Sequence, residues 1–177
     1  DKAHYYPGAG MFIIKLIADK NSRKLLGVQV LGSGAVDKVT DVGVVALTMG
    51  ATIDQLQNMD MAYAPPFSTA IHPFVTAINV LKNKLEGKMD SMTPAEFMQG
   101  KAEGYRIVDA ALMPSISGAP YVDLNTVTGE VKGLGKEEKL LLICNKGKRA
   151  YLLQNRLRFF GYTNTKVLEG GLAVTVM

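Results

Sequence analysis

The sequence of 177 residues has little that would support several large classes of protein. A single cysteine excludes an internal disulfide and suits a reducing compartment, so we expect a cytoplasmic protein. No apolar run reaches the roughly 20 residues that a membrane-spanning helix needs, so no membrane partner is expected. The net charge is only +4, and lysines and arginines are not interleaved with aromatic residues. Nucleic acid is therefore an unlikely partner, and we assign no metal ligands.

Composition and length indicate a folded chain of limited size. Hydrophobic residues make up 47% and charged residues 20%, which is typical of a globular protein. A chain of this length suits one domain or two small ones. It begins at Asp1 without a methionine or a signal-like region, so we expect a fragment of a longer protein.

The second half of the chain is organised around its only cysteine. Four apolar residues, 140–143, run directly into Cys144, and a glycine-containing loop then leads into a helical pattern over about 149–160. A continuous apolar run of this length fits a strand buried on both faces of a parallel sheet. Open sheets of this kind place ligands at the carboxyl ends of their strands. The N-terminus of the following helix favours an anion, and such a setting activates a thiol as a nucleophile.

This Cys-x-x-Gly-x-Arg pattern resembles the active-site loop of rhodanese-like sulfurtransferases. By that resemblance Cys144 carries sulfur as a persulfide, Gly147 makes the tight turn and Arg149 closes the loop. Loop N–H groups would stabilise the anion together with the cations of the loop. The expected substrate-binding residues are Asn145, Lys146, Gly147, Lys148 and Arg149. Cysteine phosphatases place arginine six positions after cysteine, whereas Arg149 is the fifth, which disfavours that class.

Other positions depart from the rhodanese pattern and leave an alternative open. Asp109 is retained, but the Arg and Glu that usually follow are replaced within 110–112, and the usual His before Gly118-Ala119 is absent. We expect a short strand at 122–124 and a polar loop over 126–133. A cysteine after an apolar run is also a common buried structural residue. An inactive rhodanese fold therefore remains the alternative to a persulfide carrier.

The first half of the chain predicts a hairpin followed by helices. Apolar runs at 11–19 and 24–31 flank a polar turn, and helical patterns follow over 36–49, 52–58 and 73–85. The intervening Gly32-Ser33-Gly34 is half of a dinucleotide fingerprint. We reject that function because Asp37 occupies the third glycine position and the preceding strand belongs to a hairpin.

This order, with Ala-Tyr-Ala-Pro-Pro-Phe-Ser at 62–68, resembles the dimerisation domain of pyridine nucleotide-disulfide oxidoreductases. The opening residues 4–9 fit the subgroup of coenzyme A-disulfide reductases, NADH oxidases and persulfide reductases, some of which carry a rhodanese domain. The resemblance implies a homodimer in which Tyr63 and Tyr5 assist catalysis at the partner's active site. His72 takes a position near the N-terminus of the last helix where the subgroup usually has Asp.

Together these patterns predict an antiparallel-sheet-plus-helices dimerisation domain over 1–87 and a small parallel-sheet rhodanese-like domain over 88–177. The fold class is thus α/β and α+β. The resemblance implies FAD and NAD(P)H in the parent protein, with their binding domains absent from these residues, and small sulfur compounds or coenzyme A derivatives as substrates. Cys144 would pass its sulfur to a flavin-linked cysteine, for release as sulfide. The competing function is a non-catalytic dimerisation module.

Overall fold

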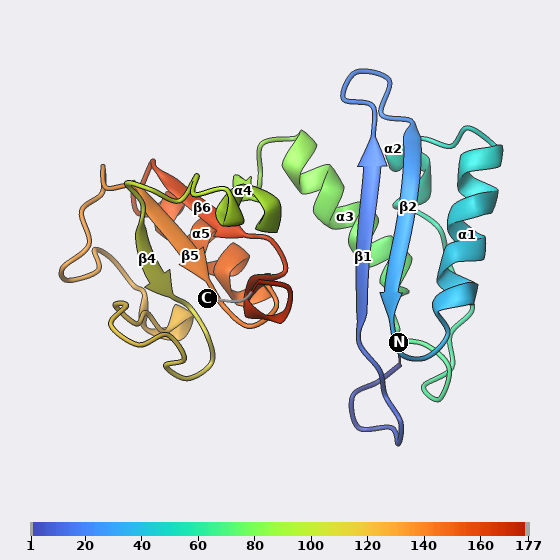
Figure 1. The fold of residues 1–177 in the computed structure, drawn as a ribbon, viewed down its shortest axis with the longest axis horizontal. Helices are drawn as coiled ribbons and strands as arrows, with labels where there is room; N and C mark the ends of the chain where they lie inside the picture. Colours follow the sequence, from blue (N-terminus) through green and yellow to red (C-terminus); the bar gives the residue numbers. More distant parts are fainter. Residues whose placement is uncertain (1, 176–177) are drawn as a thin grey trace. The chain divides into compact units, whose positions relative to one another are not determined.

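The computed structural model describes residues 2–175 and divides the chain into two compact units, Asp1–Glu86 and Gly87–Met177 (Figure 1). Among the residues described, no helix combines the length and the apolar character needed to cross a membrane.

The first unit is an antiparallel hairpin with helices, as the sequence predicted (Figure 1). Its elements are β1 (Phe12–Ala18), β2 (Leu25–Gly32), α1 (Val36–Thr48), α2 (Ile53–Leu56) and α3 (Pro73–Leu85). The side chains of Ile53, Phe74 and Ile78 are fully buried in its core. Gly43 allows α1 to approach β2 closely, because a Cβ at this position would lie 2.9 Å from the Val28 side chain.

The last helix of the first unit has a histidine as its N-cap. His72 is 5% exposed, and its Nδ1 accepts a hydrogen bond of 3.3 Å from the backbone N–H of Phe74. Burial first, and then the positive charge of Lys38, lower the pKa of the His72 imidazole. The neutral ring is the form that accepts this bond, so the folded unit favours the unprotonated histidine.

We expect the first unit to lose stability as the pH falls below about 6.5, the ordinary pKa of histidine in an unfolded chain. The unfolded chain then binds a proton before the folded one does, and this loss ends once the pH falls below the lowered folded pKa. Amide hydrogen exchange in α3 reports this change when it is measured at several pH values between about 7.5 and about 5. His72→Asn keeps an acceptor for the cap and should reduce this pH dependence. An unchanged profile in that variant would contradict the assignment.

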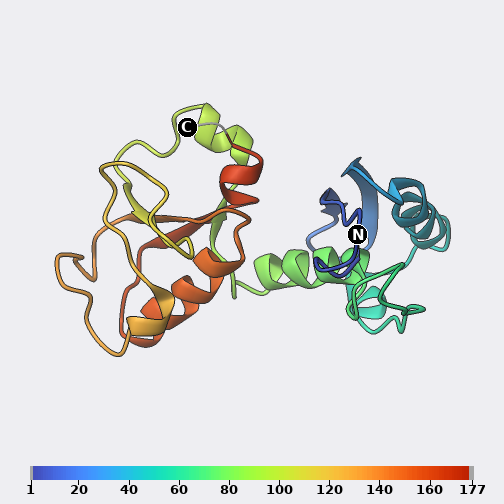
Figure 2. The same ribbon diagram turned by 90° about the horizontal axis from the view of Figure 1, so that it is seen from below.

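The second unit is a four-stranded sheet whose strands are all parallel, in the order β3-β6-β5-β4. Its elements are β3 (Ser91–Met92), α4 (Pro94–Met98), β4 (Arg106–Asp109), the 3-10 turn η1 (Leu124–Thr126), β5 (Leu140–Ile143), α5 (Lys148–Phe159), β6 (Thr165–Leu168) and the 3-10 turn η2 (Gly171–Ala173). Helices α5 and α4 lie on opposite sides of this sheet (Figure 2). The predicted parallel-sheet class is confirmed.

Strand β5 is the centre of the second unit. All four of its residues are fully buried. Leu140 and Leu142 pack with α5, whereas Leu141 and Ile143 pack on the other face with Phe97 of α4. The alternation follows from the two-residue period of a strand and explains why the sequence is apolar at every position.

The prediction of a strand at 122–124 is wrong. Tyr121 makes only an isolated bridge with Asp109, and the 3-10 turn η1 begins at Leu124. The Asp123 carboxylate accepts the backbone N–H of Asn125, and this local hydrogen bond stabilises a turn in place of an extended strand.

Candidate functional site

Cys144 lies at the carboxyl end of β5, directly before the loop that leads into α5. Its side chain packs in the core cluster beneath α5, and the residue is 3% exposed. The sulfur accepts a hydrogen bond of 3.4 Å from the backbone N–H of Ala150 in the first turn of α5. The thiol therefore lies against the N-terminus of a helix, where negative charge is stabilised.

Turn η2 fixes the orientation of the peptide groups that follow the cysteine. The N–H of Leu172 donates to the Cys144 carbonyl at 3.1 Å, and that of Ala173 donates to the Asn145 carbonyl at 2.9 Å. In a trans peptide bond the C=O and the N–H point in opposite directions, and no described peptide bond is cis. The N–H groups of Asn145 and Lys146 share their peptide bonds with these two carbonyls and therefore point away from η2. Within residues 2–175 the backbone N–H groups of residues 145–149 have no acceptor, and we call these five groups the amide cradle.

Two glycines make this arrangement sterically feasible. Gly147 precedes α5 with φ of 85°, a left-handed conformation that glycine adopts without strain. Gly171 has φ of 58°, and a Cβ there would lie 1.8 Å from the Cys144 carbonyl oxygen. The close approach of η2 to the cysteine loop thus depends on the absence of a side chain at Gly171.

The three cations of the loop have different surroundings. Lys146 and Lys148 are exposed, and neither has a carboxylate partner among the described residues. Arg149 instead donates to the Ala110 carbonyl at 3.2 Å and to the Asp123 carboxylate at 2.9 Å. Its charge is therefore balanced by Asp123, and its position ties α5 to the chain after β4. The role in anion binding that the sequence suggested for Arg149 stays a prediction.

Asp109 organises the chain that follows β4. This fully buried carboxylate accepts hydrogen bonds from the backbone N–H groups of Ala111, Ser115 and Ile116 and from the Ser115 hydroxyl. Burial raises the pKa of Asp109, but the combined hydrogen bonds outweigh it, so the pKa is lowered overall. The residue retained from the rhodanese pattern thus has a structural role here.

Replacing Asp109 with alanine should destabilise the second unit by about 3 kcal/mol, because three backbone donors lose their common acceptor. Urea unfolding followed by circular dichroism measures this loss. Ser115→Ala is the matched control, since it removes one hydroxyl and leaves the carboxylate in place; its expected effect is about 1 kcal/mol or less. Equal losses in the two variants would contradict the role assigned to Asp109.

The two tyrosines predicted to assist catalysis belong to the first unit. Tyr63 is 52% exposed and Tyr5 is 68% exposed. The Tyr5 ring contacts those of His4 and Tyr6, with centroid distances of 5.6 and 5.4 Å. Both hydroxyls are therefore on residues open to a partner molecule, and their catalytic roles stay predictions.

The second unit has the architecture of an α/β domain that presents a cysteine to a loop of backbone amides. A family model described as "Rhodanese-like domain" matches residues 77–175, and one described as "Pyridine nucleotide-disulphide oxidoreductase, dimerisation domain" matches residues 1–74. The chain belongs to the rhodanese-like family through its second unit, and its first unit is a dimerisation domain of the pyridine nucleotide-disulfide oxidoreductases.

Curated relatives share the first of these domains. The NAD(P)H coenzyme A polysulfide/persulfide reductase of Pyrococcus horikoshii is 37% identical over 81 residues, which cover 46% of this chain and 18% of the relative. The coenzyme A disulfide reductase of Staphylococcus epidermidis is 39% identical over 71 residues, covering 40% of this chain and 16% of that protein. The chain thus spans less than a fifth of the length of these relatives.

Two solved structures cover nearly the whole chain. An NAD-dependent persulfide reductase from A. fulgidus superimposes with a TM-score of 0.87 and 32% identity, covering 98% of this chain and 32% of that one. The reduced CoADR-RHD of Bacillus anthracis gives 0.86 and 28% identity, covering 97% and 31%. The order of the two domains is therefore the one found in these reductases, which confirms the resemblance seen in the sequence.

Sequence reasoning missed two features of the site. Asp123, the partner of Arg149, follows a stretch without helical or strand periodicity, and no pattern links it to the cysteine loop. The hydrogen bonds from the N–H groups of Leu172 and Ala173 to the cysteine loop were also missed. A prediction that paired the two glycine-containing loops would have found them.

Proposed function

We propose that the second unit carries sulfur as a persulfide on Cys144. The observation that carries this proposal is the amide cradle, five backbone donors without an acceptor beside a sulfur that already receives the N–H of Ala150. Donors of this kind stabilise an anion at the end of a helix. The exposed Lys146 and Lys148 add positive charge at the same loop.

The proposed reaction is a sulfur transfer without net oxidation. The Cys144 thiolate attacks the outer sulfur of a persulfide or of thiosulfate, and a new S–S bond forms at Sγ. The S–S bond of the donor breaks, and its electron pair leaves with the donor as a thiolate or as sulfite. The product anion is the outer sulfur on Cys144, which the amide cradle would stabilise. An acceptor nucleophile then takes this sulfur and restores the thiolate.

A non-catalytic dimerisation module with an inactive rhodanese fold is the second candidate. Two observations favour it: Cys144 is only 3% exposed, and Asp109 is committed to the surrounding backbone. A covered thiol reacts more slowly with external donors than an exposed one. The position of the amide cradle beside the sulfur, at the N-terminus of α5, supports the persulfide carrier over this alternative.

Intact-mass measurement on the wild-type chain tests the proposal. Incubation with thiosulfate or a polysulfide should add one sulfur atom, and cyanide should remove it as thiocyanate. The control is the same protein alkylated beforehand with a small thiol reagent, which should take up no sulfur. A folded protein whose thiol is alkylated but never loaded with sulfur would establish the non-catalytic alternative.

We also propose that the first unit pairs with a second copy of the chain. It exposes several large apolar side chains, and a surface rich in such residues can be buried by association. On the hairpin and α1 these are Ile17, Leu26, Leu31, Val44, Val45 and Met49, and in the connection before α3 they are Tyr63, Phe67 and Ile71. The match to a dimerisation domain supports the same assignment.

Sedimentation at micromolar concentration should therefore show a dimer. Val45 is 64% exposed on α1, and Val45→Glu should weaken association by about tenfold or more, since a buried unpaired charge is strongly unfavourable. Phe159→Glu is the matched control, because Phe159 is 82% exposed on the second unit. A wild-type chain that stays monomeric at these concentrations would refute the proposed pairing.

The activity of the whole protein is a broader proposal. The names of the relatives suggest NAD(P)H-dependent reduction of coenzyme A disulfides or persulfides, with FAD implied by the family. Residues 2–175 do not fit a dinucleotide, because β2, which ends at Gly32, pairs antiparallel with β1, and Asp37 occupies the third glycine position. We therefore assign to this chain the sulfur-carrying loop and the subunit interface.

A further inference from the structure

Strand β4 forms an edge of the parallel sheet and has one residue whose backbone faces outward without a partner. Arg106 and Val108 direct their peptide groups toward β5, as the bond from the Arg106 N–H to the Lys139 carbonyl shows. The backbone groups of Asp109 face outward: its N–H donates to the Pro120 carbonyl, and its C=O accepts the N–H of Val122. By the alternation of a parallel ladder, the N–H and C=O of Ile107 also face outward. Within the described part of the chain neither has a partner.

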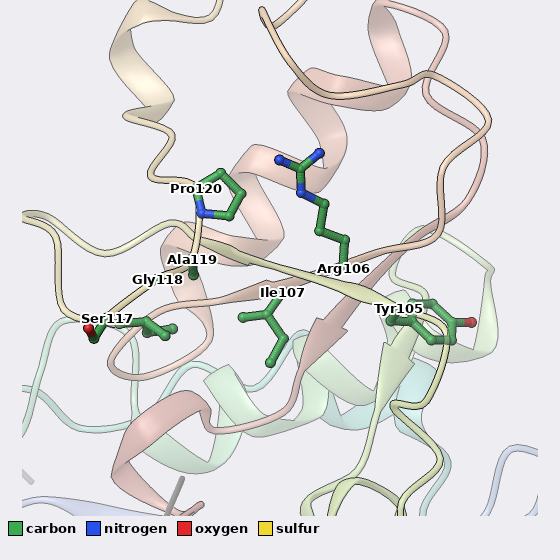
Figure 3. Close-up of a pocket in the computed structure, with 8 residues that line it drawn as sticks. Tyr105, Arg106, Ile107, Ser117, Gly118, Ala119 and Pro120 are labelled. Carbon is green, nitrogen blue, oxygen red and sulfur yellow. The ribbon is translucent and has the colours of Figure 1, made fainter.

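A pocket of about 380 Å³ adjoins this open backbone. It is lined by Tyr105, Arg106, Ile107, Ile116, Ser117, Gly118, Ala119 and Pro120. Figure 3 shows the side chains of Ile107 and Arg106 on opposite sides of β4, with the turn containing Gly118 and Ala119 beyond Ile107 and the Tyr105 ring at the other end. The pocket therefore combines a free donor, a free acceptor and an apolar wall at one strand edge.

The region around Tyr105 is positively charged. The ammonium groups of Lys139 and Lys166 each lie 6.0 Å from the centre of the Tyr105 ring. Lys166 approaches Asp90 at 3.9 Å, whereas Lys139 has no carboxylate partner among residues 2–175. The positive charge of Arg106 is balanced by Glu138 at 3.3 Å. An acidic group bound near Tyr105 would thus find an uncompensated cation.

We propose that the edge of β4 at Ile107, which the pairing of Asp109 with residues 120–122 leaves open, binds an extended peptide segment of a partner protein by strand addition. A peptide residue in extended conformation presents the N–H and C=O pair that matches Ile107. One aliphatic side chain of the segment fills the pocket against Tyr105 and Ile116, and an acidic residue lies toward Lys139. This site is separate from Cys144 and does not depend on whether that residue carries sulfur.

The probe is a fluorescein-labelled acetyl-Glu-Val-Ile-Val-Glu-amide, titrated against the full chain by fluorescence anisotropy. Saturable binding should appear, and the same unlabelled peptide should shift and protect the Ile107 amide in nitrogen-proton NMR spectra. A peptide with an N-methyl group on its central amide cannot donate to the Ile107 carbonyl and should bind about tenfold more weakly or worse. Equal binding of the two peptides would overturn strand addition.

Two protein variants test the site from the other side. Ile107→Pro removes the outward N–H while leaving the ladder bonds of β4 to β5, since proline is tolerated on edge strands. It should lower peptide affinity about tenfold or more. Lys139→Glu should also weaken binding, and replacing both Glu residues of the probe by Lys should restore it. Lys132→Glu, an exposed residue in the same unit, is the matched charge control.

Other outcomes would overturn the proposal. If Ile107→Pro does not fold, the N-methylated peptide still decides the question on the wild-type chain. Self-association of the wild-type chain that the β4 variants abolish, without binding of the probe, would show that a second copy covers this edge. Probe binding with no change at the Ile107 amide would place the peptide elsewhere.

Discussion

Replacing Cys144 with serine is expected to abolish sulfur loading while preserving the fold. Cys144 is the only cysteine, so a protein persulfide has no other site to form. Serine is close in size, and its hydroxyl can accept the N–H of Ala150 that the sulfur receives. Loading, and the thiocyanate released by cyanide, should fall by about a hundredfold or more, because serine is a far weaker nucleophile without a base to activate it.

Intact mass and thiocyanate release measure the loss, and circular dichroism monitors the fold. Thr128→Ser serves as the control, because Thr128 is exposed in the same unit and lies outside the amide cradle, so that variant should load as the wild type does. A Cys144→Ser protein that still gains cyanide-removable sulfur would show that the adduct is not a cysteine persulfide. The assignment of Cys144 as the carrier would then be wrong.

Replacing Gly171 with alanine is expected to destabilise the second unit by about 4 kcal/mol or more. An added Cβ would lie 1.8 Å from the Cys144 carbonyl oxygen, which is a backbone atom and cannot move by a rotamer change. The backbone φ of 58° adds about 1 kcal/mol for a residue other than glycine. Any protein that still folds must move η2 away from the loop, so sulfur loading should fall together with stability.

Gly100→Ala is the control that separates the steric overlap of the added Cβ from the strain of a positive φ. Gly100 also has a positive φ, of 79°, but a Cβ there would meet nothing within 4 Å. The control should lose only about 1 kcal/mol in urea unfolding and should load sulfur normally. If the two alanine variants were equally stable, the close packing of η2 against the cysteine loop would not exist in solution.

Much of the architecture could be predicted because local pattern and tertiary environment agree. The apolar run at β5 requires burial on both faces, and the structure buries all four residues between α5 and α4. Thr52 and Thr93 similarly cap helices α2 and α4, each within a reciprocal capping box that is local in sequence. In these places the physical preference of a short segment already determines its structure.

Features that depend on the order of strands could not be predicted in the same way. Nothing local places β4 at the edge of the sheet, so the outward backbone of Ile107 could not be foreseen. The partner of Arg149 is Asp123, which comes from an irregular segment 26 residues away. The strand expected at 122–124 does not form, because the hydrogen bond of the Asp123 side chain stabilises a turn and outweighs the strand propensity of the β-branched Val122.

The burial of Cys144 also bears on how the protein withstands oxidants. Oxidation of a thiol through sulfenic to irreversible sulfonic acid follows its thiolate character and its access to peroxide. At 3% exposure, the side chain of Cys144 offers little access to a peroxide molecule. The packing that slows the arrival of a sulfur donor thus also shields the only cysteine of the chain from irreversible damage.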